Sequence, residues 1–134
     1  MSPYLQKNII AVSSAMEIPL QLRTGLTIFP CAAASMKYYI SQARSYGYKI
    51  YLGTLLPIDG WRTYADFREK LRNEFNDWMR TTDLADGCID FDKALRNPDN
   101  PSAFLPIYDS GDHLHPSKEG YKKMAETVLT EILY

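Results

Sequence analysis

The sequence predicts an α/β fold in which helices cover both faces of a small parallel sheet. Three observations support this prediction. From residue 32 on, the expected elements alternate in the order helix, strand, helix, strand, helix. The first of these strands, residues 48–56 (YKIYLGTLL), is apolar on both faces, which is typical of a strand between two helical layers. Each long helix has one apolar face, so the elements stack in layers around a common core.

Length and composition agree with one globular domain. The chain has 134 residues, of which 46% are hydrophobic and 23% charged, and this excludes the disordered and fibrous classes. A formal net charge of −1 favours binding neither to nucleic acid nor to an anionic membrane. No stretch is long and apolar enough to span a bilayer, and the N-terminus shows no secretion signal. As written, the chain is therefore expected in the cytoplasm.

The first 35 residues give the weakest pattern. Residues 8–16 are compatible with a short helix and residues 26–29 with a short strand, while Pro19 and Pro30 interrupt any longer element. We therefore treat residues 1–35 as a segment of undefined structure that precedes the main domain.

The pattern is clear from residue 32 on. Met36, Ile40 and Ala43 share one face of a helix, and Gly47 follows it where a helix ends in a left-handed residue. After the strand at 48–56, a turn leads to a second amphipathic helix, residues 63–81. The apolar face of this helix is expected to consist of Tyr64, Phe67, Leu71, Phe75 and Trp78.

A second strand is predicted at residues 87–91 (GCIDF), followed by a polar loop over 92–111 with one helical turn near 93–96. Ser117 has the composition of an N-cap for the last helix. The apolar stripe of that helix would consist of Tyr121, Met124, Ala125, Val128, Leu129 and Ile132.

Two predicted strands make a sheet with exposed edges, whose free backbone groups invite pairing with another segment. Functional residues of open parallel sheets gather beyond the carboxyl ends of the strands. The loop after residues 87–91 lies in such a place.

That loop contains both histidines of the chain, in the run Asp112-His113-Leu114-His115-Pro116. An imidazole titrates near neutral pH, so it can accept a proton from a hydroxyl and return it to a leaving group. A carboxylate on the other ring nitrogen fixes the tautomer of such a base. Asp112 and His115, three residues apart before a helix, are therefore candidate catalytic residues.

Two other interpretations stay open at this point. Asp112 could cap a turn beside a histidine of purely structural role. A metal site is the other possibility, because four capable ligands lie close together: Asp109, Asp112, His113 and His115. The two cysteines, Cys31 and Cys88, match no metal or redox spacing; they could pair with each other, but buried thiols are favoured. We expect no cofactor and no metal.

Several segments together resemble one enzyme family. The run 108–121 (YDSGDHLHPSKEGY) strongly resembles the last conserved block of the SGNH/GDSL hydrolases, in which Asp-x-x-His-Pro supplies two members of a catalytic triad. Residues 47–57 look like the fourth core strand of that family, 76–80 and 85–92 like its following helix and fifth strand, and 94–101 like the loop that leads to the catalytic block. The resemblance covers residues 36–134, and it looks closest to esterases of acylated carbohydrates such as xylan acetylesterases.

The resemblance implies a three-layer, flavodoxin-like fold that lacks the N-terminal strands of the full family. It also implies that His115 is the general base, that Asp112 orients it, and that His113 is only the intervening residue. In a complete family member, a serine attacks an ester carbonyl and forms an acyl-enzyme that water hydrolyses. The amide of that serine, a glycine amide and an asparagine side chain hold the oxyanion.

The chain departs from the family in its N-terminal motifs. The Gly-Asp-Ser block, the oxyanion glycine and the Gly-x-Asn-Asp block are absent from the sequence, and neither Ser2 nor Ser13-Ser14 has the flanking residues of a nucleophile. Ser110 belongs to the catalytic-loop motif itself and lies too close to His115 in sequence to replace a nucleophile at the end of a strand. Members of a triad work as a unit, so the chain is expected to be inactive alone. Whether it is an enzyme is therefore open.

The expected partners follow from this. A completed site would take an acylated small molecule or a carbohydrate ester, and intact relatives are often secreted. The alternative is a non-catalytic assembly module that pairs through an open sheet edge, as a homodimer or with a complementing N-terminal half.

Overall fold

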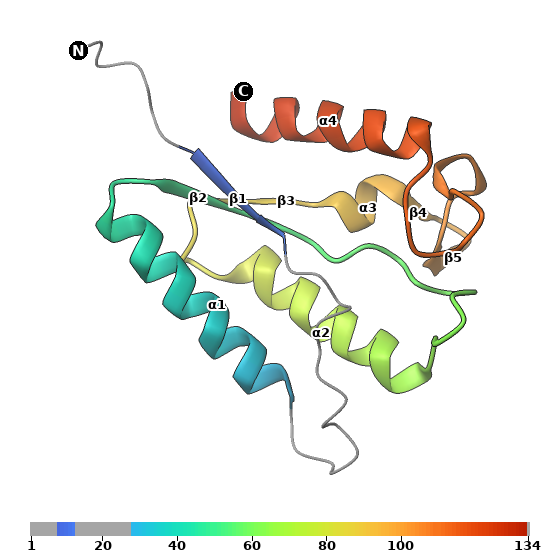
Figure 1. Ribbon diagram of the computed structural model, residues 1–134, viewed down its shortest axis with the longest axis horizontal. Helices are drawn as coiled ribbons and strands as arrows, with labels where there is room; N and C mark the ends of the chain where they lie inside the picture. The colour runs from blue at the N-terminus through green and yellow to red at the C-terminus, as the bar shows by residue number, and fades with distance from the viewer. Residues whose placement is uncertain (1–7, 13–27, 134) are drawn as a thin grey trace.

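A computed structural model describes residues 8–12 and 28–133 of the chain. A parallel sheet of three strands is formed by β1 (Asn8–Val12), β2 (Lys49–Gly53) and β3 (Gly87–Ile89), with β2 in the middle. Helices α1 (Ile28–Ser45) and α2 (Asp66–Thr81) lie on one face of this sheet, and α4 (Lys118–Leu133) lies on the other (Figure 1). The α/β fold with a small parallel sheet and helices on both faces is thus confirmed.

The central position of β2 explains why its sequence is apolar on both faces. Asn8 to Val12 of β1 pair with Lys49 to Gly53, and Gly87 to Ile89 of β3 pair with Tyr51 to Gly53 on the other side. The main core lies between β2 and the two helices below it in Figure 1. Its buried members are Ala33, Ile40, Ile50, Leu52, Leu55, Phe75 and Met79.

Two expectations for the N-terminal part were wrong. Residues 8–12 form a strand, not a helix, because the apolar β-branched run NIIAV finds a parallel partner in β2. Ile28 and Phe29 belong to α1 rather than to a strand. The rest of both predicted elements, residues 13–16 and 26–27, lies outside the described residues.

The segment predicted to be mostly loop is more ordered than expected. It contains the short helix α3 (Phe91–Leu95), an antiparallel hairpin of β4 (Arg96–Asn97) and β5 (Asn100–Phe104), and the 3₁₀ turn η3 (Pro106–Tyr108). The sequence NPSAF of β5 has no period-two pattern of apolar residues, so pattern reading could not identify this strand.

The faces of the two amphipathic helices also differ from the prediction. Phe67 of α2 is 55% exposed, and the helix instead buries three polar side chains, Glu69, Arg72 and Asn76. On α4, Tyr121 and Leu129 are exposed. Periodicity placed both helices correctly, but on α2 it assigned to the surface polar residues that the fold buries.

Those buried polar side chains join the carboxyl ends of β2 and β3 to α2. Asn76 donates through Nδ2 to the Leu55 carbonyl (2.9 Å) and accepts from the Leu55 amide (2.7 Å). The fully buried Asp92 accepts from Arg72 (2.5 Å), Arg80 (2.7 Å) and Arg96 (3.1 Å). Among the described residues, no buried side-chain nitrogen or oxygen lacks a hydrogen-bond partner. This network fixes the end of the sheet from which the loops after β2 and β3 emerge.

Two smaller findings complete the fold. Cys88 is a free, half-buried thiol whose pKa is raised to about 11 by burial, whereas the side chain of Cys31 lies outside the described part. Within residues 28–133, no helix is long and apolar enough to cross a membrane.

Candidate active site

The loop that connects η3 to α4 is closed at its base like a small hairpin. Asp109 and Pro116 form an isolated β-bridge, and the Ser110 amide donates to the His115 carbonyl (3.0 Å). We call residues 109–116 the histidine loop. Its two ends are held together as in an antiparallel pair of strands, so the six residues between them have a defined shape.

Helix α4 begins directly at the end of the histidine loop. Ser117 Oγ accepts from the Gly120 amide (3.1 Å) and donates to the Ile107 carbonyl (2.6 Å), which confirms the predicted N-cap. A Cβ on Gly120 would lie 2.7 Å from the Tyr108 carbonyl oxygen and 2.9 Å from Pro116 Cβ. Only glycine therefore allows the first turn of α4 to pack this closely against the loop.

Asp112 and His115 are in direct contact within the histidine loop. Asp112 Oδ2 lies 2.5 Å from His115 Nδ1. Its Oδ1 accepts from the amides of His115 (2.8 Å) and Leu114 (2.9 Å) and from Ser110 Oγ (2.9 Å). The hydrogen bond from the His115 ring, followed by the two amides, holds the pKa of Asp112 well below its usual range.

This geometry decides the tautomer of His115. An ionised carboxylate can only accept hydrogen bonds, so Nδ1 of His115 must carry the proton that it shares with Asp112. The other ring nitrogen, Nε2, then has a free lone pair while the ring is neutral. The side chain of His115 is 59% exposed, so this lone pair is open to a hydroxyl group brought from elsewhere.

The histidine loop contains a second imidazole–carboxylate pair. His113 Nδ1 lies 2.6 Å from Asp109 Oδ2, and Asp109 Oδ1 accepts from the amides of His113 (3.1 Å) and Gly111 (2.8 Å). From the sequence, Asp109 and His113 were considered as possible metal ligands, and His113 also as the residue that only intervenes between Asp112 and His115 in the family motif. Within the described residues, no group of three or more His, Cys, Asp or Glu side chains is arranged to hold a metal ion.

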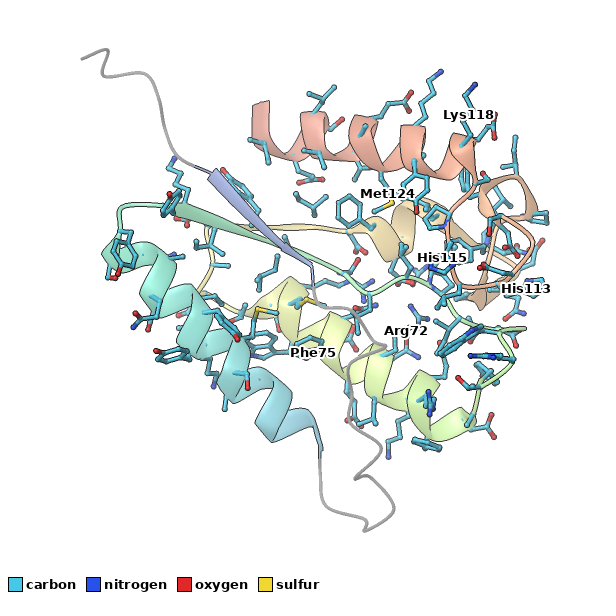
Figure 2. All side chains as sticks on the ribbon, in the orientation of Figure 1. Arg72, Phe75, His113, His115, Lys118 and Met124 are labelled. Atoms are coloured by element: carbon cyan, nitrogen blue, oxygen red, sulfur yellow. The ribbon has the colours of Figure 1, made fainter. Side chains whose placement is uncertain are left out.

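A hollow of about 500 Å³ opens beside these pairs. One wall is the histidine loop, from Gly111 to His115, and the other is the loop after β2, with Gly60, Trp61 and Arg62. Figure 2 shows His113 and His115 where these two loops meet. The loop after β2 is held by the Ser102 carbonyl, which accepts from the amides of Ile58 (3.1 Å) and Asp59 (2.8 Å).

Trp61 and Arg62 escaped sequence reasoning because their segment was interpreted only as a turn. The signal that could have identified them is the position of the segment, directly beyond the carboxyl end of the central strand. Nothing in the sequence alone indicates that this segment faces a loop fifty residues away.

The described part of the chain offers His115 no nucleophile. Ser117 and Ser110 are the serines nearest to His115 in sequence, but Ser117 donates its hydroxyl to the Ile107 carbonyl and Ser110 donates its hydroxyl to Asp112. No described serine hydroxyl makes a hydrogen bond to the His115 ring. Ser2, Ser13 and Ser14 lie outside the described residues. The site therefore has an imidazole in contact with a carboxylate, next to an open hollow.

Comparisons with known proteins agree on the family. Residues 21–123 match the model of the GDSL-like lipase/acylhydrolase family. A lipolytic protein of the G-D-S-L family from Desulfitobacterium hafniense has a similar structure (TM-score 0.67, 23% identity over 90% of this chain). A GDSL-like lipase from Bacteroides thetaiotaomicron is also similar (TM-score 0.64, 18% identity over 80% of this chain). So is a protein from Bacteroides fragilis described as an acylhydrolase (TM-score 0.62, 20% identity over 80% of this chain).

The chain spans 62%, 53% and 52% of the lengths of these three proteins, respectively. No curated protein sequence matches it. The solved structures are too distant in sequence to show more than the fold. The family match, in contrast, covers well over half of the chain, including the loop with Asp112 and His115. The chain belongs to the GDSL-like lipase/acylhydrolase family.

Proposed function

We propose that this chain supplies the general base and the orienting acid of a serine ester hydrolase, and that it hydrolyses esters only when a nucleophile and oxyanion donors join it. The observation that carries the proposal is the contact between Asp112 and His115, in which the carboxylate fixes a ring whose second nitrogen is open to solvent. Family membership supports the reaction type.

The proposed reaction needs a serine nucleophile and oxyanion donors from outside the described residues. A serine hydroxyl gives its proton to Nε2 of His115 as its oxygen attacks the ester carbonyl. The alcohol leaves with that proton, and an acyl-serine remains. Water then attacks the acyl group, again with His115 as base, and the acid and free serine are released. Asp112 keeps its charge throughout and stabilises the imidazolium.

The proposed substrate is an acylated carbohydrate or another small acylated alcohol, as for esterases of the xylan acetylesterase type. Trp61 supports this choice, since its half-buried indole lies on the wall of the hollow that faces His115. An aromatic face is a common surface for packing against a sugar ring. The hollow, of about 500 Å³, is also large enough for a bulky alcohol.

A direct test combines an ester assay with an active-site probe. The purified chain is given p-nitrophenyl acetate and, separately, a fluorophosphonate that labels activated serines. We expect neither turnover nor labelling from the chain alone. Addition of a separate N-terminal fragment that carries Gly-Asp-Ser and Gly-x-Asn-Asp blocks should produce both, and His115→Ala should abolish them. Turnover by the chain alone that depends on His115 would contradict the proposed need for a second segment.

A second function, that of a non-catalytic assembly module, is favoured by one observation. Among the described strands, β1 has a neighbour on one side only, which leaves backbone groups for another strand. Such a module would form a homodimer or bind a complementing N-terminal half. Sedimentation of the chain over a range of concentrations tests this, because a monomer at every concentration argues against self-association.

A further inference from the structure

We propose that Asp109 and His113 form a positioning pair for His115. In this proposal the ring of His113, fixed by Asp109 and seated on Gly60, joins the histidine loop to the loop after β2 and so sets the place and tautomer of the His115 ring. The inference rests on the proposed role of His115 as general base.

The first support is the conformation of His113. Its backbone has φ 61, and it is the one residue other than glycine with positive φ in the described part of the chain. Such a conformation costs free energy and persists only where its surroundings enforce it. Asp109 does this twice, since one carboxylate holds both the amide and the ring of His113. The side chain of Asp109 is only 12% exposed.

The second support is the seat of the ring on Gly60. Gly60 has φ +90, and a Cβ there would lie 2.8 Å from Cγ of His113 and 3.0 Å from its Cδ2. The ring thus rests on bare backbone of the loop after β2. That loop is itself fixed, by hydrogen bonds to Ser102 and by a bond from the Trp61 amide to the Ile58 carbonyl (3.1 Å). His113 therefore connects the histidine loop to the loop that follows the central strand of the sheet.

The third support is the short path from His113 to the Asp112–His115 pair. Leu114 alone separates the two histidines, and its amide and that of His115 both donate to Asp112 Oδ1. A shift of His113 would pull on these two donors and on the carboxylate that fixes Nδ1 of His115. His113 would then act on the reaction through His115 without contact with the reacting atoms.

The experiment uses the fact that the chain has only two histidines. Nitrogen-15 NMR of the side chains then reports two imidazoles and the tautomer of each. Gly60→Ala places a methyl group in the seat of the His113 ring. The matched control is Gly47→Ala, because Gly47 also has positive φ (+78) but no atom near the added Cβ.

In the parent we expect a fixed Nδ1–H tautomer for His115, with well-separated resonances of the two ring nitrogens. In Gly60→Ala these resonances should move toward each other, as in an imidazole that exchanges between tautomers. In Gly47→Ala the spectrum of His115 should equal that of the parent. His113→Asn is the second variant, since asparagine tolerates the left-handed conformation but has no ring; it should reproduce the change seen in Gly60→Ala.

A parent-like His115 spectrum in folded Gly60→Ala or His113→Asn overturns the proposal, and so does an equal change in Gly47→Ala. If Gly60→Ala does not fold, His113→Asn decides. The readout needs no hydrolysis, so the two ideas fail separately. If Gly60→Ala and His113→Asn change the His115 spectrum as expected, but the chain gives no turnover with an N-terminal fragment, then only the proposed function is refuted and the positioning role of His113 stands.

Discussion

Asp92 and Asp112 are both carboxylates held by basic side chains, yet they lie in opposite surroundings. Asp92 is fully buried and accepts from three arginines that come from α2 and from the start of the hairpin. Asp112 is 50% exposed and is satisfied within its own loop, by the ring of His115 and three donors between residues 110 and 115. The first group depends on the whole fold for its partners, and the second depends on one short loop.

This difference indicates a division of roles. A buried charge stripped of its partners is costly, so the Asp92 network stabilises one arrangement of strands and helices. An exposed pair adds little to stability because water competes for both groups. The Asp112–His115 pair is therefore free to serve chemistry. The following predictions test this division, from the largest expected effect to the smallest.

Asp112→Asn should have the largest effect, and chiefly on catalysis. The amide would favour the wrong tautomer of His115, for which a loss of about 10⁴-fold in kcat is expected by analogy with serine proteases. The measurement is ester hydrolysis by the chain completed with an N-terminal fragment, alongside urea unfolding of the chain. A loss of less than tenfold would remove Asp112 from its proposed role.

Arg72→Met should have the next largest effect, and on stability. It removes the ion-pair partner of Glu69, which then accepts only from Asn73 Nδ2 (3.1 Å), and it removes one of the three arginines from Asp92. Breaking a buried ion pair in this way costs about 3–5 kcal/mol. Urea unfolding followed by circular dichroism measures this loss. Asp77→Ala is the control, because the Asp77–Arg80 pair is exposed and should change stability by less than about 1 kcal/mol. Equal losses in both variants would contradict the division.

Ser117→Ala should have an intermediate effect on stability. It removes the cap of α4 and the bond to the Ile107 carbonyl, for which a loss of about 1 kcal/mol is expected. Since the cap also closes the histidine loop, hydrogen exchange at residues 109–116 should become faster. Unchanged exchange there would show that the β-bridge alone closes the loop.

Ser110→Ala should have the smallest effect, seen in the titration of Asp112. The pKa of Asp112 is lowered in the folded chain, so its pairing stabilises the fold above the unfolded value of about 3.9 and is lost as pH falls through the folded value. Loss of the Ser110 hydroxyl should raise the folded pKa, so protonation begins at a higher pH. The carboxyl carbon-13 shift of Asp112 measures this. Fluorophosphonate labelling lost in this variant would instead identify Ser110 as a nucleophile.

The sequence alone determined the features that depend on residues close together in the chain. The end of α1 before Gly47 follows from local backbone geometry, and the beginning of α4 after Ser117 follows from capping. The contact between Asp112 and His115 joins residues that are only three positions apart. Strand β2 was recognisable because a central strand has apolar side chains on both faces, and this pattern is visible in its sequence. Each of these features is encoded within about twenty residues.

Only the tertiary structure decided the rest. Strand β1 exists because residues 8–12 find a partner forty residues away, and β5 pairs without any apolar pattern of its own. In the sequence, Arg72 and Glu69 look like surface residues of a helix. In the fold they are buried, because Arg72 pairs with Asp92 from another element. Likewise, Gly60 becomes the seat of His113 only when two distant loops meet. The physical reason is that these features depend on partners that are far apart in sequence, and a local pattern contains no information about which partner burial will select.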